Sequence, residues 1–296
     1  MIINMRGQTA PAERFAAMRT IEAVRVTETV RRLCIEANCH LPEDVRECLS
    51  HCREKETFPV AEDILDQIIE NYQIADRDNV PICQDTGMAC VFVEIGQDVH
   101  VEGNLSEAIH EGVRRGYTEG YLRSSVVRDP IDRVNTRDNT PAMIYYDIVP
   151  GDELKITVAP KGFGSENMSQ IKMLKPSDGL EGVKKFILQA VEDAGPNPCP
   201  PIVVGVGVGG TFDKAALMAK KALIRPANSR NPDPFYAALE DEMLEKINAL
   251  GIGPQGFGGY TTALAVNIEK CPTHIAGLPV AVNINCHVTR HQSEVI

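Results

Sequence analysis

The sequence has 296 residues, of which 43% are hydrophobic and 24% are charged, so the chain is apolar enough to fold around its own core. Its net charge of −11, the absence of Trp and the low content of Phe and Tyr argue against a nucleic-acid-binding protein. The nine cysteines are an odd number, and no apolar segment suits a signal peptide or a membrane helix. We therefore expect a soluble, cytoplasmic protein with reduced thiols and no membrane association.

The first quarter of the chain is predicted to be helical. An apolar stripe predicts a helix from Thr20 to Asn38, and Pro42 and Pro59 each suit the first turn of a further helix. We assign residues 1–76 to this helical N-terminal region.

After Asp78, predicted strands and helices alternate along the chain. Short β-branched or apolar runs predict strands at residues 89–96, 142–149, 153–160, 201–208, 261–269 and 277–286. Helical periodicity predicts helices at residues 105–121, 182–194, 212–224 and 234–250. The last two strands are expected to pair with each other. Without repeats or linkers, the pattern predicts a mixed α/β protein, with residues 1–296 forming a single domain: one body of mixed β-sheet with surrounding helices.

Three cysteines stand at the boundaries of predicted elements, where side chains can point into a shared site. Cys83 lies in VPICQDTG, Cys199 lies in GPNPCPP, and Cys286 ends the last strand. Their spacing matches no local metal motif, and free cysteines often serve as small buried hydrophobic residues. If the three converge, they suit an iron–sulfur cluster in which one iron lacks a protein ligand and can act as a Lewis acid.

A second group of metal-binding residue types lies in the helical N-terminal region. Cys48, His51 and Cys52 are close in sequence, and Cys39 and His40 precede them. They could bind zinc in an interaction module, although the spacing fits no standard zinc motif. The alternative is that the thiols face the core.

Gly205, Gly207 and Gly210 spell G-x-G-x-x-G between a predicted strand and a predicted helix. This context is typical of nicotinamide-dependent oxidoreductases. The acidic residue that the fingerprint requires about 20 residues further on is missing, because that region is a loop after a helix. Close packing of the strand against the helix therefore explains the glycines better.

Three further residues have chemistry that could serve a site. Asp85, beside Cys83, could exchange a proton with metal-bound water or could merely cap its own turn. Arg123 could bind a substrate carboxylate in a bidentate pair or offset the dipole of the helix that it ends. His274 and Cys286 flank one predicted strand, so they need not touch unless the chain turns.

Several longer segments are specific enough to be compared with known families: PICQDTG, GYLRSSV, NTRDNTPA, PKGFGSENMSQIKML, NPCPPIVVGVGVGGTFDKAALMAKKAL, GIGPQGFGGYTTALAV and THIAGLPVAVNINCHVTRH. Together they closely resemble the iron–sulfur (class I) fumarate hydratases, in particular the alpha subunit of the two-subunit form. The resemblance runs from the helical N-terminal region to the last residue. Tartrate dehydratase alpha subunits belong to the same family.

This resemblance implies the site residues one by one. Cys83, Cys199 and Cys286 match the three protein ligands of a 4Fe-4S cluster, and the other six cysteines match no ligand position. Asp85 matches a residue that faces the substrate and the open iron, and His274 matches a histidine on the substrate side.

The resemblance also implies how the substrate binds. Gln84 accompanies Asp85, and Arg123 matches an arginine that binds a substrate carboxylate. One glycine of the GFGS loop, Gly162 or Gly164, matches a backbone contact to the substrate. The implied reaction is the reversible hydration of fumarate to malate, and a tartrate or mesaconate-type dehydratase is the alternative.

Single-chain members of the family carry a further C-terminal domain that completes the site. This sequence has only residues 287–296 after Cys286. The resemblance therefore implies a beta subunit as partner, a small dicarboxylate as substrate, and a higher oligomer of alpha–beta pairs.

Overall fold

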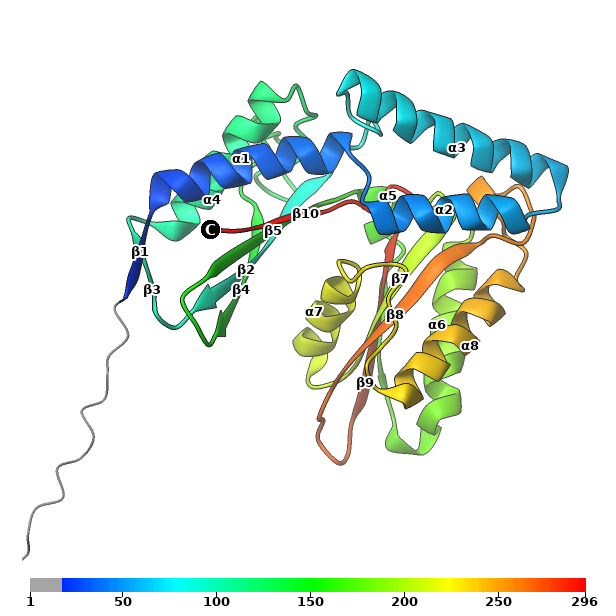
Figure 1. Cartoon of the computed structure of the whole chain (residues 1–296). Helices are drawn as coiled ribbons and strands as arrows, with labels where there is room; N and C mark the ends of the chain where they lie inside the picture. The colour runs from blue at the N-terminus through cyan, green and yellow to red at the C-terminus, as the bar shows by residue number, and fades with distance from the viewer. Residues whose placement is uncertain (1–17) are drawn as a thin grey trace, which may run out of the picture.

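The computed structural model describes residues 18–296 and confirms the mixed α/β class (Figure 1). Residues 1–17 of the predicted helical region lie outside the described part. The helices are α1 (Ala23–Cys39), α2 (Glu43–Lys55), α3 (Pro59–Asp78), α4 (Leu105–Glu119), α5 (Phe163–Glu166), α6 (Gly179–Ala194), α7 (Phe212–Ala222) and α8 (Pro234–Asn248), with short 3-10 turns η1 (Pro176–Asp178) and η2 (Pro254–Gly256). The strands are β1 (Arg19–Glu22), β2 (Met88–Gly96), β3 (Val99–Glu102), β4 (Met143–Val149), β5 (Leu154–Lys161), β6 (Gln170–Leu174), β7 (Ile202–Gly209), β8 (Ala263–Cys271), β9 (Leu278–Asn285) and β10 (Gln292–Val295). No helix within residues 18–296 is both long enough and apolar enough to cross a membrane.

Most strands form two four-stranded sheets, and the first sheet has the order β10-β5-β2-β4. Strand β2 lies parallel to β4 and antiparallel to β5. Helices α1 and α4 pack on this sheet and enclose a core that includes Leu33, Ile109 and Ile156 (Figure 1). The two helices lie close together, since a Cβ on Gly112 would stand 2.6 Å from the Cβ of Val30.

The first helix starts later than predicted. Helical structure was expected from Thr20, but residues 19–22 form β1, which pairs in parallel with β3 in a two-stranded sheet. The β-branched side chains of Thr20 and Ile21 favour a strand, and Ile21 is buried in the first core. Helix α1 therefore begins at Ala23.

The second sheet has the order β6-β9-β7-β8, with α7 on one face and α6 and α8 on the other (Figure 1). Strand β7 is parallel to β8 and antiparallel to β9. The prediction that the last two long strands pair with each other was wrong, because β7 lies between them. Every residue of β7 except Val208 is buried. A strand that is apolar on both faces belongs at the centre of a sheet, which explains this order.

The glycines of β7 let α7 approach the sheet closely. A Cβ on Gly205 would lie 2.2 Å from the carbonyl oxygen of Ala219, and one on Gly207 would lie 2.1 Å from that of Ala215. Both carbonyl groups belong to α7, so any side chain at these positions would displace the helix. The close strand–helix packing expected from the G-x-G-x-x-G pattern is confirmed.

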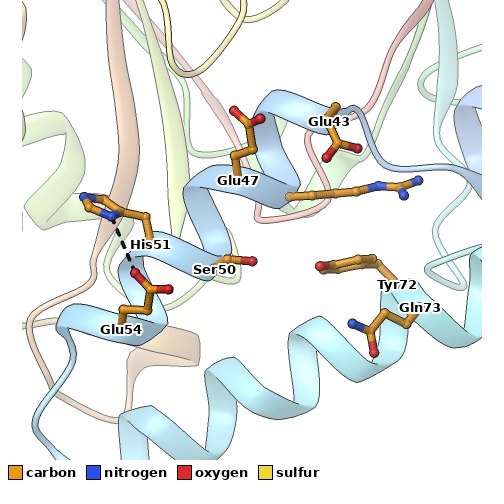
Figure 2. Close-up of a pocket in the computed structure, with 8 residues that line it drawn as sticks. Glu43, Glu47, Ser50, His51, Glu54, Tyr72 and Gln73 are labelled. Carbon is orange, nitrogen blue, oxygen red and sulfur yellow. Dashed lines mark ion pairs between the residues drawn. The ribbon is translucent and has the colours of Figure 1, made fainter.

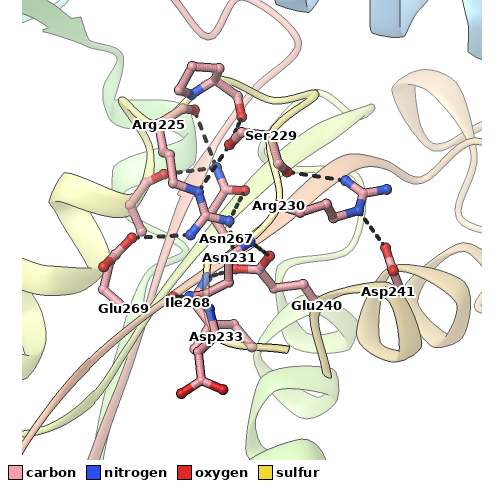
Figure 3. A network of polar contacts seen from close by, with 12 residues as sticks. Arg225, Ser229, Arg230, Asn231, Asp233, Glu240, Asp241, Asn267, Ile268 and Glu269 are labelled. Carbon is pink, nitrogen blue, oxygen red and sulfur yellow. Dashed lines mark hydrogen bonds and ion pairs between the residues drawn. The ribbon is translucent and has the colours of Figure 1, made fainter. Parts of the chain in front are cut away.

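A buried polar network fixes the connection between α7 and α8 (Figure 3). The Arg225 guanidinium donates to Glu240 at 2.6 Å, to Glu269 at 3.1 Å and to Asn267 at 3.0 Å. Glu240 also accepts the backbone N–H of Ile268 at 2.7 Å. The positive charge of this arginine is thus balanced by two carboxylates of its own chain.

Helices α2 and α3 lie across one end of the second sheet (Figure 1). A third hydrophobic cluster joins them to β7 and β8 and includes Leu49, Leu65, Val203 and Leu264. The α3–β2, β5–β6 and β9–β10 connections each pass from the side of one four-stranded sheet to the other. The predicted site residues Cys83, Gly162 and Cys286 lie in these three crossings.

Glu56 ties the α2–α3 connection to the loop before β8. Its buried carboxylate accepts hydrogen bonds of 3.0 to 3.2 Å from the backbone N–H groups of Thr57, Phe58, Tyr260 and Thr261. Burial on its own would raise the pKa of Glu56, but these four donors hold that pKa below its usual value. The carboxylate therefore stays ionised and clamps the two loops together.

Candidate active site

Cys83 lies in the α3–β2 connection, which backbone contacts hold in place. The N–H of Ile82 donates to the carbonyl oxygen of Asn38 at 3.0 Å, and the Asn71 side chain donates to the carbonyl oxygen of Ile82 at 2.9 Å. The Cys83 sulfur accepts the backbone N–H of Asp85 at 3.4 Å. This contact holds the sulfur of Cys83 beside the backbone of Asp85.

Cys199 and Cys286 are brought together because β7 and β9 are antiparallel neighbours. Val203 of β7 pairs with Asn285 of β9, so the residues before β7 and after β9 share one end of the sheet. His287 closes the link, since its Nδ1 lies 2.9 Å from the carbonyl oxygen of Cys199. The second sheet therefore places Cys199 and Cys286 at the same end of its strands.

The three cysteines differ in exposure but lie in one neighbourhood. Burial raises the pKa of the Cys286 thiol, and the positive charges of Arg290 and Lys161 oppose this rise. Burial also raises the pKa of Cys199, although its side chain is partly open to solvent. Cys83 and Cys286 pack against the same third hydrophobic cluster, and Cys83 also adds to the rise in the pKa of both other thiols.

Within residues 18–296, no three or more His, Cys, Asp or Glu side chains are gathered tightly enough to hold one metal ion. A cubane cluster makes a different demand on its ligands. Each cysteine binds a separate iron atom, so the sulfur atoms stand further apart than around a single ion. Three cluster ligands such as Cys83, Cys199 and Cys286 therefore need not form a site for a single ion.

Asp85 is oriented by backbone donors from two different loops. Its Oδ1 accepts the N–H of Gly87 at 3.0 Å, and its Oδ2 accepts the N–H of Phe163 at 3.0 Å. The first contact is the turn cap that the sequence suggested as an alternative role. A Cβ on Gly162 would lie 3.2 Å from Oδ2, whereas one on Gly164 would make only an ordinary contact at 3.7 Å. Of the two candidate glycines, Gly162 is the one that lies against the carboxylate.

Buried charges anchor the GFGS loop that contacts Asp85. Lys161 donates to the carbonyl oxygen of Ile284 at 2.8 Å and to the Ser165 hydroxyl at 2.9 Å. Glu166 pairs with Lys161 at 3.4 Å and with Lys220 at 2.5 Å. The loop between the sheets is thereby fixed to both β9 and α7.

Arg123 and Gln84 are held at the same end of the first sheet. The Thr86 hydroxyl accepts the N–H of Arg123 at 2.9 Å and donates to its carbonyl oxygen at 3.3 Å, which fixes Arg123 beside the Asp85 loop. The side chains of Arg123 and Gln84 are exposed. The guanidinium is therefore accessible to an anion that approaches Asp85 from solvent.

His274 lies at the other end of the second sheet. It belongs to the exposed β8–β9 loop, where the neighbouring Thr273 hydroxyl donates to the carbonyl oxygen of Gly210 at 2.9 Å. Strand β9 has 8 residues at about 3.3 Å each, so its two ends stand about 25 Å apart. A single chain therefore does not bring His274 to Cys286.

Cys48, His51 and Cys52 of α2 line one cavity between α2 and α8. Cys48 and Cys52 pack against the third hydrophobic cluster, and burial raises the pKa of each thiol to about 11. His51 is exposed, and its Nδ1 lies 4.0 Å from Glu54 (Figure 2). This face of α2 borders an open, polar groove between α2 and α3 (Figure 2). None of the residues that the resemblance assigns to the active site lines that groove.

Sequence reasoning missed several residues that shape the site. Lys161 and Arg290 are buried cations whose charges act on Cys286. Charged side chains are seldom buried, and the place of Lys161 at a strand end gives no sign that it is. Arg290 was detectable only through its place in the segment NCHVTRH. The backbone N–H of Gln255, which donates to the carbonyl oxygen of Pro200 at 2.8 Å, left no signal in the sequence.

Comparison with known proteins places these features in a family. The family model described as fumarate hydratase (Fumerase) matches residues 27–295. A Methanocaldococcus jannaschii protein described as a putative L(+)-tartrate dehydratase subunit alpha is 46% identical over 274 residues, which cover 90% of this chain and 96% of that protein. The L(+)-tartrate dehydratase subunit alpha of Escherichia coli K12 is 34% identical over 270 residues, which cover 90% of this chain and 89% of that protein.

Proposed function

The chain belongs to the fumarate hydratase family and is therefore a hydro-lyase, and we propose that it is the cluster-binding alpha subunit of an enzyme that reversibly hydrates fumarate to malate. One observation carries this proposal. Cys83 and Cys286 lie in crossings between the two sheets, Cys199 lies beside His287 at the same end of the second sheet as Cys286, and two backbone donors hold the Asp85 carboxylate next to Cys83.

The residues at this edge fit a 4Fe-4S cluster. Cys83, Cys199 and Cys286 would hold three irons, and the N–H of Asp85 already points to one of the sulfur atoms. The charges of the buried Arg290 and Lys161 both act on Cys286, one of these three ligands. When bound, the cluster supplies a Lewis acid at the iron that lacks a cysteine ligand.

The chain's own residues then bind the dicarboxylate and move a proton. Arg123 pairs with one substrate carboxylate, and Gln84 and the backbone at Gly162 position the rest of the molecule. Asp85 gives a proton to the departing hydroxyl, or takes one from water in the reverse direction, at whichever carboxylate oxygen faces the substrate. Its two backbone donors fix its orientation.

His274 can take part only in an assembly. Because the β8–β9 loop lies a full strand length from Cys286 in the same chain, another chain must bring such a histidine to the site. This distance supports our proposal of a higher oligomer of alpha–beta pairs.

A beta subunit completes the proposed enzyme. The relatives from Methanocaldococcus jannaschii and Escherichia coli are both described as alpha subunits, which implies a second subunit in those enzymes. The base that takes the proton from the carbon next to the hydroxyl is assigned to that subunit. We place the enzyme in the cytoplasm, because reducing conditions keep cysteine thiols free to bind a cluster.

Dehydration of L(+)-tartrate is the second candidate, and the names of these relatives favour it. The complex with the beta subunit, assayed without oxygen on fumarate, malate and L(+)-tartrate, separates the two. We expect kcat/KM for malate to exceed that for tartrate by about 100-fold, since a pocket built for one hydroxyl tolerates a second one poorly. The opposite ratio would reassign the substrate.

The cluster ligands are tested by anaerobic reconstitution with iron and sulfide. Cys83→Ser, Cys199→Ser and Cys286→Ser should each abolish the cluster absorption. Cys271→Ser is the matched control, because Cys271 pairs with Gly209 at the opposite end of the second sheet and should leave the cluster unchanged. Normal iron and sulfide content in all three ligand variants would refute the assignment of these cysteines as cluster ligands.

A further inference from the structure

Arg290 is a buried arginine whose charge is not matched within the described chain. Its side chain lies in the β9–β10 crossing, and the residue is 4% exposed. One Nη group donates to the carbonyl oxygen of Asp85. The other two nitrogen atoms, Nε and Nη1, have no hydrogen-bond partner within residues 18–296.

Such an arrangement is costly without a compensating anion. An unpaired charge in a protein interior loses its hydration, and a buried nitrogen without an acceptor loses its hydrogen bond. Arg225, a part-buried arginine of the same fold, has two carboxylate partners: Glu240 and Glu269 both pair with it (Figure 3). Arg290 is the more deeply buried arginine of the two and has no carboxylate partner within residues 18–296.

The groups on which the charge of Arg290 acts indicate where an anion would bind to its guanidinium. Its charge acts on the thiols of Cys286 and Cys39, on the Tyr117 phenol and on the His287 imidazole, none of which is a carboxylate. Among these groups, only Cys286 is one of the proposed cluster ligands. The Asp85 carbonyl that Arg290 contacts belongs to the Cys83 loop, so Arg290 bridges two of the three ligand segments.

The second buried cation near Cys286 is already satisfied. Lys161 bonds to the carbonyl oxygen of Ile284 and the hydroxyl of Ser165, and it forms an ion pair with Glu166 at 3.4 Å. Its charge is therefore committed to the GFGS loop. Of the two buried cations near Cys286, only Arg290 has both an unpaired charge and free N–H donors within residues 18–296.

We propose that Arg290 is a positioning residue for the iron–sulfur cluster: it supplies the counter-charge for the cluster and ties the Cys83 and Cys286 segments together. This inference rests on the proposed function. Three thiolates carry more negative charge than a 4Fe-4S core carries positive charge, so a bound cluster is a net anion. Binding of the cluster would give the buried guanidinium an anionic partner. In the apo-protein the guanidinium stays buried without that partner, which destabilises the fold.

The test compares Arg290→Met and Arg290→Lys with the wild-type chain. Met removes the charge but keeps an unbranched side chain, and Lys keeps the charge. Each protein is melted without cluster, then reconstituted without oxygen, and its iron content, rate of iron loss to a chelator and reduction potential are measured. Arg225→Met is the matched control, because it removes a part-buried arginine from its own carboxylates, Glu240 and Glu269, and breaks no contact with a proposed cluster ligand.

We expect Arg290→Met to melt at or above the wild-type temperature without cluster, yet to lose iron to the chelator about 10-fold faster. Its potential should move to more negative values, since electron uptake is harder without the positive charge. Arg290→Lys should lie close to wild type in both iron retention and potential. Arg225→Met should lower the melting temperature and leave the potential unchanged.

Three outcomes would overturn the proposal. Arg290→Met could retain iron and potential like the wild type, or its apo-protein could melt well below the wild type or fail to fold. Alternatively, Arg290→Lys could lose iron as fast as Arg290→Met, which would make geometry and not charge decisive. A wild-type chain that takes up no cluster would instead refute the proposed function, so the two failures are distinguishable.

Discussion

Replacing Glu56 by Gln tests how the loops behind the site are held together. The substitution keeps the size of the side chain but removes its charge. One amide oxygen can still accept the N–H groups of Thr57 and Phe58. The amide nitrogen must then face the N–H groups of Tyr260 and Thr261, which leaves donors pointing at a donor.

The expected loss of stability follows from these contacts. A hydrogen bond to a charged group contributes about 1.5 to 3 kcal/mol, and two such bonds are lost while the loops relax partly, so we expect Glu56→Gln to cost about 3 kcal/mol. For a chain of this size, that corresponds to a fall in melting temperature of about 5 °C. Glu54→Gln, on the same helix with its carboxylate exposed, should change stability by less than about 0.5 kcal/mol.

The effect should also depend on pH in a defined direction. The pKa of Glu56 is lower in the folded protein than its ordinary value of 4.5, so the carboxylate stabilises the fold fully above that value. As the pH falls through 4.5 towards the folded pKa, this contribution is lost. The stability difference between wild type and Glu56→Gln should therefore be largest near neutral pH and shrink in acid.

Thermal and urea unfolding of wild type, Glu56→Gln and Glu54→Gln, followed by circular dichroism at several pH values, measures these differences. The reasoning fails if Glu56→Gln unfolds like Glu54→Gln. It also fails if its destabilisation stays constant from neutral pH into acid.

Two further predictions concern the site itself. Gly162→Ala should lower kcat of the complex at least about 10-fold because its Cβ would press on Asp85, whereas Gly164→Ala should keep near-normal turnover; equal losses would contradict the geometry. In the apo-protein, an alkylating reagent should modify the exposed Cys199 long before Cys34, whose burial raises its pKa to about 12, as mass spectrometry of timed samples would record. Modification of Cys34 at a comparable rate would mean that the first core opens readily.

The sequence predicted most of the long elements because their periodicity is strong. Strands with β-branched runs and helices with apolar stripes were recognised, and the glycines of β7 were correctly interpreted as packing positions. The short strands β1, β3, β6 and β10 were missed. Each has 4 or 5 residues and depends on a partner far along the chain, so no local pattern marks it.

The order of strands could not be predicted from local signals. The chain returns directly from β8 to β9, which suggests a hairpin, but the doubly buried β7 occupies the place between them. Strand pairing is settled by which strand is apolar on both faces and by what packs on them, and that information is spread over the whole sequence.

The candidate site shows a similar division. Cys83, Cys199 and Cys286 were singled out because they stand at element boundaries, and the resemblance gave them a shared role. The buried cations were not predicted, because the sequence does not show which charged side chains lose contact with water. The remoteness of His274 depends on the direction of β9, which only the fold supplies.

The crossings between the two sheets also bear on which changes of length the chain can accept. Loops at the far ends of the sheets, such as the one between β8 and β9, can gain or lose residues without shifting the cysteine edge. Packed helices or strands hold both ends of each crossing in place. One inserted residue would therefore shift the hydrogen-bond donors and cysteines that the crossing carries. Variation among natural sequences should therefore gather in the outer loops, and a split or circularly permuted chain should be opened there and not at Cys83, Gly162 or Cys286.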